Sequence, residues 1–468
     1  MDFDPIAERK QEQKATAWLR LWSSRQPELL SMHLAHKHRP ASGKPVSACL
    51  WKSGAFNICY RVRYNNNNNN NEEPDIIIRF AALGRAILRR EKVQNEVATM
   101  NYLRKTTSIP IPEVYASGIC WAGPYIIMSA IEGVPLSQLL KDHSFAGRPV
   151  LNPQISNHSL KHAYREMAIL VLELSRVQFD SIGALEETQH GDLFTITKRP
   201  LTFNMNELMA SANIPLEAFP PPSHTFTSST DYLYSLATQH LLHLRLQQQK
   251  PSITSEEDFQ RKLIARYLFL NLTKNLHLTN PQGPFRLYCD DFRPSNVLID
   301  LNTSRVSAVI DWEFTYTAPA EFTYVAPWWL LLQSPEDWEG DLHQFLDRYI
   351  PRFNVFLEVL RECEDELMGQ GLLLESQRLA SRMGESLDNG LFWVCLAARY
   401  SSMFDEIYWE FVDRRFYGDL GSLQDRVRLL SEEQRREMDE LVIGKLGRCD
   451  RGEDEFEDHY PIDVLLEL

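Results

Sequence analysis

The sequence contains no hydrophobic run long enough to cross a membrane. Its longest apolar stretches, PYIIMSAI and PWWLLL, are much shorter than the roughly 20 residues that a membrane-spanning helix needs. The first residues, MDFDPIAERKQEQK, are polar and lack the apolar core of a signal peptide. We therefore expect no membrane partner and a cytoplasmic location.

Closely spaced cysteines are also missing. The seven cysteines are scattered along the chain, and none forms a C-x-x-C pair. This spacing excludes the usual zinc motifs and disulfide frameworks, and it is typical of reduced thiols.

Positive charge is in short supply. The 49 Lys and Arg residues stand against 63 Asp and Glu residues, which gives a formal net charge of -14. Such a balance disfavours nonspecific binding to nucleic acid and weakly favours cationic ligands. With 468 residues, 44% of them hydrophobic, the chain is long enough for two or three compact units with a sizeable core.

The most informative stretch is LYCDDFRPSNVLIDLNTSRVSAVIDWEF, residues 287–314. A polar loop precedes two short apolar strands, residues 297–300 and 306–310, which are separated by the turn at residues 302–304. If this hairpin forms, Asp311 lies beside Asp291 and Asn296. Phosphoryl transfer uses this set of groups: one carboxylate orients the attacking hydroxyl, while an amide and a second carboxylate hold magnesium.

This stretch resembles the aminoglycoside phosphotransferase family, whose relatives include choline kinases and protein kinases. The family pattern is H-x-D-x-x-x-x-N followed by I-D-W/F, and the segments IDWEFTYTAPAEF and PWWLLLQSPEDW look especially like fungal members. The resemblance implies that Asp291 is the catalytic base and that Asn296 and Asp311 are metal ligands. Cys289 stands where the family has His. The alternative interpretation is an acidic surface loop between two strands.

Two segments before this stretch are where the family contacts the nucleotide. Residues 50–62, LWKSGAFNICYRV, predict strand, turn and strand, with Gly54 at the bend. The resemblance makes this hairpin the nucleotide-covering loop, in which Asn57 contacts a phosphate, although a lone glycine is usual in any hairpin. Arg79, at the end of the predicted strand PDIIIRFA, would contact the α- and β-phosphates. Otherwise Arg79 is a strand-end cation that extends to solvent.

The apolar spacing of residues 84–105 predicts a helix. In a kinase-like lobe this helix supplies a carboxylate to the basic strand, so we expect Glu96 to pair with Arg79, with Glu91 as the competing candidate. A cluster of cations on the same helix is expected to form a charged outer face: Arg85, Arg89, Arg90 and Lys92.

The strand at residues 125–129 is followed by a polar, Gly-containing segment. The resemblance makes this the hinge between lobes, where the backbone from Ser129 to Ile131 meets the adenine edge. The alternative is an ordinary buried edge strand. A helix buried in the second lobe is expected at residues 160–179. A long insertion follows at residues 186–286, with helices expected at 230–247 and 259–276, and it is either a substrate pocket or a structural cap.

Two further segments leave alternatives open. Asn65 to Asn71 is an asparagine run that cannot bury apolar surface and should form a loop. The aromatic residues after Asp311, including Trp328, Trp329 and Trp338, could bind an organic cation or belong to the core, which is the preferred interpretation for Trp328 and Trp329.

Together these features predict an α+β, bilobal protein-kinase-like fold, with a small antiparallel-sheet lobe and a large, mostly helical lobe. The expected division is a helical lead-in (1–49) that packs on the small lobe, the nucleotide-binding small lobe (50–130), the large lobe (131–445) and an acidic tail (446–468). The expected function is transfer of the γ-phosphate of ATP, or of GTP, with Mg²⁺, to a hydroxyl of a small molecule that the sequence does not identify, a cation being one candidate class. The alternative is a pseudokinase that binds nucleotide or a partner without transfer.

Overall fold

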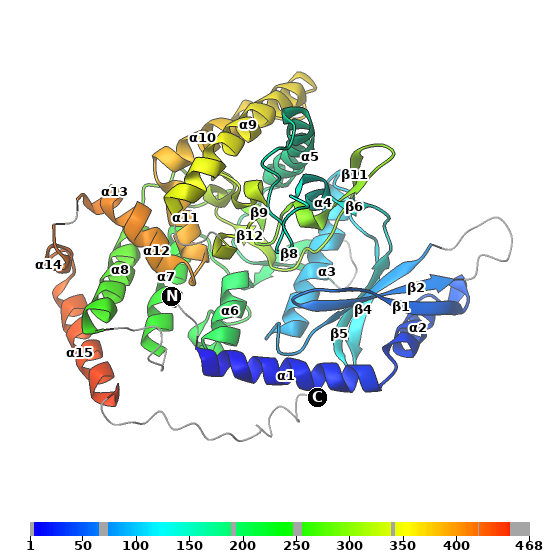
Figure 1. Ribbon diagram of the computed structural model, residues 1–468, viewed down its shortest axis with the longest axis horizontal. Helices are drawn as coiled ribbons and strands as arrows, with labels where there is room; N and C mark the ends of the chain where they lie inside the picture. Colours follow the sequence, from blue (N-terminus) through cyan, green and yellow to red (C-terminus); the bar gives the residue numbers. More distant parts are fainter. Residues whose placement is uncertain are drawn as a thin grey trace.

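The computed structural model describes residues 4–64, 74–188, 193–246, 255–337, 342–419 and 421–449. The predicted asparagine run, Trp338 and the acidic tail beyond Cys449 lie outside these residues. The described chain forms two lobes (Figure 1), a small one built on a five-stranded antiparallel sheet and a large one that is mostly helical. This arrangement confirms the predicted α+β, two-lobed fold class. No described helix is long and apolar enough to span a membrane.

The small-lobe sheet has the strand order β1-β2-β3-β5-β4. Its inner positions are apolar and fully buried, as Ile76, Ile78 and Phe80 on the central strand show. One helix of this lobe, α3, connects β3 to β4 and packs against β4 and β5. The bounds are β1 (Pro45–Ser53), β2 (Asn57–Tyr64), β3 (Ile76–Ala81), α3 (Arg89–Thr106), β4 (Val114–Cys120) and β5 (Gly123–Ser129).

Two N-terminal helices, α1 (Pro5–Ser24) and α2 (Pro27–His38), cover one face of this sheet. Trp18 donates its indole N–H to the carbonyl of Ala122 at 2.9 Å, and Trp22 packs edge-on against Phe80. The helix α1 also reaches the large lobe, because the backbone N–H just before it, at Asp4, donates to the Ser211 carbonyl at 2.8 Å. Figure 1 shows α1 passing below both lobes.

The large lobe carries three small sheets, with strand orders β11-β10-β6, β12-β9 and β7-β8. Their strands are β6 (Val134–Pro135), β7 (Ala184–Glu187), β8 (Phe194–Lys198), β9 (Arg286–Cys289), β10 (Val297–Asp300), β11 (Arg305–Val309) and β12 (Thr315–Ala318).

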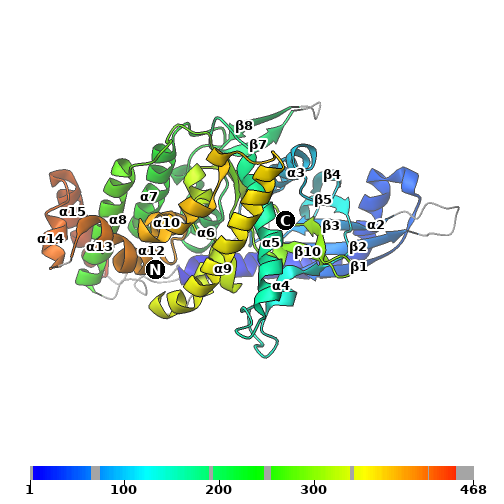
Figure 2. The same cartoon turned by 90° about the horizontal axis from the view of Figure 1, so that it is seen from above.

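The rest of the large lobe is helical. Helices α7 and α8 pack on each other, as do α5 and α9. Figure 2 shows α7, α8 and α15 at the end of the molecule opposite the small-lobe sheet. The helices are α4 (Leu136–Leu140), α5 (Asn157–Arg176), α6 (Phe203–Ser211), α7 (Ser229–Leu246), α8 (Glu256–Asn275), α9 (Leu342–Gly369), α10 (Ala380–Asp388), α11 (Leu391–Arg399), α12 (Phe404–Ile407), α13 (Asp413–Tyr417), α14 (Leu423–Val427) and α15 (Glu432–Cys449).

Strand register places two loops side by side at the border between the lobes. Antiparallel pairing sets Cys289 of β9 opposite Thr315 of β12, and Val297 of β10 opposite Val309 of β11. The loop between β9 and β10, residues 290–296, therefore lies next to the loop between β11 and β12, residues 310–314. We call these two segments the first loop and the second loop.

Candidate active site

Backbone hydrogen bonds join the two loops. Asp290 N–H donates to the Phe314 carbonyl at 3.2 Å, and Ile310 N–H donates to the Asn296 carbonyl at 2.9 Å. These bonds extend the flanking strand pairs into the loops, so Asp291, Asn296 and Asp311 are held by one continuous backbone framework. Rigid support of this kind is what a positioned catalytic group needs.

Asp291 lies among polar partners in the first loop. Its Oδ1 lies 2.9 Å from Nε of Arg293, and its Oδ2 accepts a hydrogen bond from Nδ2 of Asn296 at 2.9 Å. Burial raises the pKa of the Asp291 carboxyl to about 7, while the nearby Arg293 cation acts to lower it. A carboxyl that titrates near neutral pH is suited to accept a proton.

Asn296 and Asp311 have a donor set that fits magnesium. Nδ2 of Asn296 is turned toward the Asp291 carbonyl and carboxylate, which leaves the amide oxygen as its acceptor for a cation. Asp311 contributes a carboxylate. Among the described residues, no group of three or more Asp, Glu, His or Cys side chains is arranged to hold a metal ion by itself. Two oxygen ligands supplemented by substrate phosphates and water are the usual way in which Mg²⁺ is held in phosphoryl-transfer sites.

The second loop contains two strained residues. Asp311 has φ +67° and Phe314 has φ +55°, a left-handed conformation that non-glycine residues adopt rarely. Glycine would adopt this conformation without strain, but neither position is a glycine. Strain of this kind is concentrated at functional sites, where the surrounding structure fixes the side-chain direction.

Arg79 connects the small lobe to this loop. Its guanidinium forms an ion pair with Glu96 of α3 and donates from Nη1 to Oδ1 of Asp311 at 2.9 Å. Burial acts to lower the pKa of Arg79, but the two carboxylates hold that pKa above its usual value. The structure therefore contains the predicted Arg79–Glu96 pair, while its contact with phosphates stays a prediction.

Glu91 has a different partner, which removes it as the competing brace for Arg79. Arg199 forms two parallel hydrogen bonds with the Glu91 carboxylate, at 3.0 and 2.8 Å. Arg199 follows β8 in the large lobe and is itself buried. Helix α3 is therefore held to the large lobe by this bidentate pair as well.

Lys92 corrects the prediction that the cations of α3 form one outer face. Its side chain is 1% exposed, and its ammonium pairs with Glu313 of the second loop and donates to Asn57 Oδ1 at 3.1 Å. Glu313 is 3% exposed and also accepts from Nδ2 of Asn57 at 2.9 Å. Although burial acts to raise it, the Lys92 cation holds the pKa of Glu313 below its usual value.

The loop between β1 and β2, which we predicted to cover the nucleotide, has the expected hairpin form, but its Asn57 side chain has partners within the protein. Gly54 lies in the β1–β2 turn, where its N–H donates to the Asn57 carbonyl at 2.9 Å. The Asn57 side chain faces Lys92 and Glu313, so a phosphate contact by Asn57 would compete with these bonds. At the tip, Phe56 packs edge-on against Phe314 and Phe203, which closes the hairpin onto the large lobe.

At the predicted hinge, two of the three backbone N–H groups already donate hydrogen bonds within the protein. Ser129 N–H donates to the Glu113 carbonyl at 2.9 Å, and Ala130 N–H donates to the Asp75 carbonyl at 3.0 Å. Of the three residues from Ser129 to Ile131, Ile131 therefore supplies the N–H that we expect to meet an adenine edge.

Cys289, in the position where the family has His, contacts the second loop. Its thiol donates to the Glu313 carbonyl at 3.6 Å, so it still joins the first loop to the second. Burial raises the pKa of this thiol well above its usual value, which makes it inert. Cys289 also borders a cavity of about 70 Å³, together with Tyr288, Phe292 and Trp329. The side chain is thus smaller than the space available to it.

Sequence reasoning missed Asp290. One oxygen of its buried carboxylate accepts from the Phe203 N–H at the start of α6, at 2.9 Å, and the other accepts from the Tyr316 hydroxyl at 3.2 Å. Helix α6 is also joined to the segment before α3, since Asn206 accepts from Ile87 N–H at 3.0 Å. Of the long insertion, α6 thus reaches the site, whereas α7 and α8 contribute to the core.

The aromatic residues after Asp311 are core residues as far as the structure describes them. Trp328 and Trp329 are buried, as preferred from the sequence. One face of Tyr288 and one face of Phe322 lie against the chain's own Arg399, 4.8 and 5.1 Å from the ring centres. On these faces the protein itself supplies the cation.

The Lys92–Glu313 pair gives a test of this network. Lys92→Met should lower the free energy of unfolding by about 3–5 kcal/mol, because it leaves the Glu313 charge buried without its cation. Adding Glu313→Gln should restore part of the loss. Urea titration at pH 7 measures both.

Lys161→Met is the matched control, because Lys161 and Glu358 form a pair whose side chains are 38% and 53% exposed. This control should cost less than about 1 kcal/mol. Equal effects of the Lys92 and Lys161 changes would contradict the buried pair.

Comparison with known proteins supports the assignment of the chain to a family. A protein described as Clavilactone A biosynthesis cluster protein Y, from Ampulloclitocybe clavipes, is 23% identical over 258 residues, which are 53% of this chain and 56% of the relative. The chain thus spans little more than half the length of this curated relative.

Solved structures of similar proteins include aminoglycoside phosphotransferases. The GDP complex of a mutant aminoglycoside 2'-phosphotransferase-IIIa is 13% identical, with 92% of this chain and 100% of that chain covered and a TM-score of 0.41. An aminoglycoside phosphotransferase from Streptomyces rimosus is 16% identical, with 70% and 97% covered and a TM-score of 0.31. Both scores are low, so the assignment rests on a family model.

That model, described as the phosphotransferase enzyme family, matches residues 60–354. The match includes Arg79, Glu96, both loops of the site and α6. Because it spans more than half of the chain, the chain belongs to the phosphotransferase enzyme family, in agreement with the resemblance to aminoglycoside phosphotransferases.

Proposed function

We propose that the chain transfers the γ-phosphate of ATP or GTP, with Mg²⁺, to a hydroxyl group of a small molecule. The observation that carries this proposal is the convergence of Arg79, Asp291 and Asp311 on one interlobe site. Arg79 comes from the small lobe, whereas the two carboxylates come from the two adjacent loops of the large lobe. Asp311 has a strained backbone conformation, and the pKa of Asp291 is raised to about 7. A purely structural protein would not need both carboxylates at the border between the lobes.

Asp291 accepts the hydroxyl proton and orients the attacking oxygen. Its carboxylate is held by Asn296 on one side and by Arg293 on the other, so it has a fixed direction. Arg293 also places a cation beside Asp291, where the negatively charged phosphate would be transferred. Positioning and charge neutralisation supply most of the rate gain in this reaction type.

Asn296 and Asp311 would hold magnesium through their side-chain oxygens. When bound, the metal supplies charge neutralisation for the phosphate oxygens. Arg79 neutralises phosphate charge directly, and Glu96 keeps the guanidinium in place. Because Arg79 already donates to Asp311, binding of the nucleotide must rearrange this hydrogen bond.

Thermal unfolding tests the nucleotide site without knowledge of the acceptor. Nucleotide at about a hundred times its dissociation constant should add roughly 2.7 kcal/mol of stability, and this gain should require magnesium. Asp311→Ala should abolish the magnesium-dependent part, whereas Asp347→Ala, at an exposed position on α9, should keep it. Asp291→Asn should keep the shift and lose turnover. A shift in Asp311→Ala equal to that of the wild type would contradict the metal assignment.

The titration of Asp291 predicts the pH dependence of turnover. The carboxylate form accepts the proton, and its pKa is about 7 in the free protein. The value of kcat/KM for ATP hydrolysis, with water as acceptor, should therefore fall about tenfold per pH unit below that pKa, since kcat/KM reports the free enzyme.

Arg293→Gln removes a cation that lowers the pKa of Asp291, so this change should move the acid limb to higher pH. Arg348→Gln, at an exposed position on α9, is the control and should leave the profile in place. A limb that does not move in Arg293→Gln would contradict the role of Asp291.

A pseudokinase is the second candidate, and Cys289 in the position of the family histidine favours it. The observed thiol contact to Glu313 argues for retained activity, because the bond between the two loops is kept. Cys289→His should therefore change ATP turnover by less than about fivefold, with room for the imidazole in the adjacent cavity. A gain of two or more orders of magnitude would favour the pseudokinase.

A further inference from the structure

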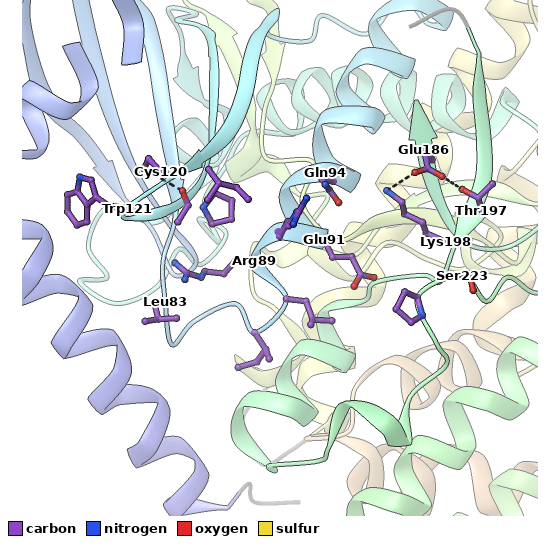
Figure 3. A pocket seen from close by; sticks show the side chains of 17 residues that line it. Leu83, Arg89, Glu91, Gln94, Cys120, Trp121, Glu186, Thr197, Lys198 and Ser223 are labelled. Carbon is purple, nitrogen blue, oxygen red and sulfur yellow. Dashed lines mark hydrogen bonds and ion pairs between the residues drawn. The ribbon is translucent and has the colours of Figure 1, made fainter. Parts of the chain in front are cut away.

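A concave site separate from the interlobe site borders the start of α3. It is a groove of about 940 Å³ between the start of α3, the β4–β5 turn and the β8 region of the large lobe. Figure 3 shows its two walls, with Leu83, Cys120 and Trp121 on the small-lobe side and Thr197, Lys198 and Ser223 on the large-lobe side. This volume is in the range of pockets that hold small molecules, and none of the residues assigned to phosphate transfer lines it.

The walls of the groove are mainly apolar. Leu83, Leu88, Trp121 and Pro222 line it, and Ile119 at its rim is 60% exposed. Ile119 lies on β4, which is an edge strand of the small-lobe sheet. An exposed branched side chain beside a large apolar concavity is typical of a surface that binds a ligand.

The polar groups of the groove have an unbalanced charge. The Glu186 carboxylate pairs with Lys198 at 3.3 Å, and the Glu91 carboxylate is bound by Arg199, so both acidic groups are neutralised locally. Arg89 and Arg90 begin α3, and Arg89 donates from Nη1 to the Ala122 carbonyl at 3.1 Å. Arg90 is exposed, and no carboxylate in the described part of the chain pairs with it.

We infer that this groove binds a small amphipathic anion, a molecule with an aromatic or aliphatic body and a carboxylate, sulfonate or phosphate group. The apolar walls would take the body, and Arg90 would take the anion. The chain as a whole has a formal net charge of -14, which repels anions. A groove with a net positive charge attracts an anionic ligand locally.

The groove is coupled to the interlobe site through α3. Glu91, which lines the groove, holds α3 to the large lobe through Arg199, and the next residue, Lys92, holds the second loop through Glu313. A ligand between the two walls would therefore contact α3, the helix that carries Glu96 and, through Glu96, positions Arg79. We expect its occupancy to change the affinity of the nucleotide, and this part of the inference rests on the proposed function.

Two fluorescent probes test the binding site on the full chain. 1-Anilinonaphthalene-8-sulfonate has an aromatic body and one negative charge, and N-phenyl-1-naphthylamine has the same rings without the sulfonate. Arg90→Glu should weaken binding of the sulfonate at least fivefold and leave the neutral probe within twofold. Ile119→Asp should weaken binding of both probes at least fivefold.

Two matched changes at distant exposed positions are the controls, Arg348→Glu on α9 and Ile443→Asp on α15, where Ile443 is 72% exposed. Both should leave the two dissociation constants unchanged, and unchanged circular dichroism should establish that each variant is folded. Equal affinity of the sulfonate for the wild type, Arg90→Glu and Ile119→Asp would overturn the site. Equal loss of both probes in Arg90→Glu would overturn the anionic class.

The coupling is tested by the apparent dissociation constant for ATP with and without saturating sulfonate probe, from thermal unfolding. The wild type should show at least a threefold change, and Arg90→Glu should show none. No change in the wild type would overturn the coupling, and so would a change that persists in Arg90→Glu, because that result identifies competition at the nucleotide site. The probe-binding arm needs no nucleotide, so its result stands whether or not the proposed function holds.

Discussion

The guanidinium of Arg79 lies between two carboxylates that belong to different lobes. Glu96 reaches it from α3, and Asp311 reaches it from the second loop of the large lobe. A buried cation between a buried carboxylate and a partly buried one is costly to separate, since each group would lose its compensating charge. The relative position of the two lobes, and with it the geometry of the site, therefore depends on this contact.

Other charged contacts repeat the same arrangement along α3. Glu91 is bound by Arg199, and Lys92 is bound by Glu313, so successive residues of the helix are joined to different parts of the large lobe. Helix α3 thus transmits any displacement of the insertion or of the second loop to the brace of Arg79.

The sequence predicted the parts of the site that follow from local patterns. The hairpin around Asp311, the strand that carries Arg79 and the helix that carries Glu96 each have a clear periodicity, and the family resemblance predicted that these elements come together. It did not predict Lys92 as an interior residue, because a lysine among other cations on a polar helix has the pattern of a solvated face. Its partner Glu313 is 221 residues away, and no local signal links two such positions. Asp290 was missed for a similar reason, since its partners come from α6 and β12.

The position of α1 has a consequence for the order in which the chain folds during synthesis. Trp18 and Trp22 leave the ribosome well before their partners, since the carbonyl that accepts from Trp18 belongs to Ala122, and the one that accepts from the residue before α1 belongs to Ser211. Contacts of such long sequence separation form late, because loop closure must precede them. The small-lobe sheet therefore lacks its cover until β4 and β5 have been made, and the anchor of α1 on the large lobe forms later still. During this interval two tryptophans and the apolar face that they later cover are open to chaperones or to other nascent chains.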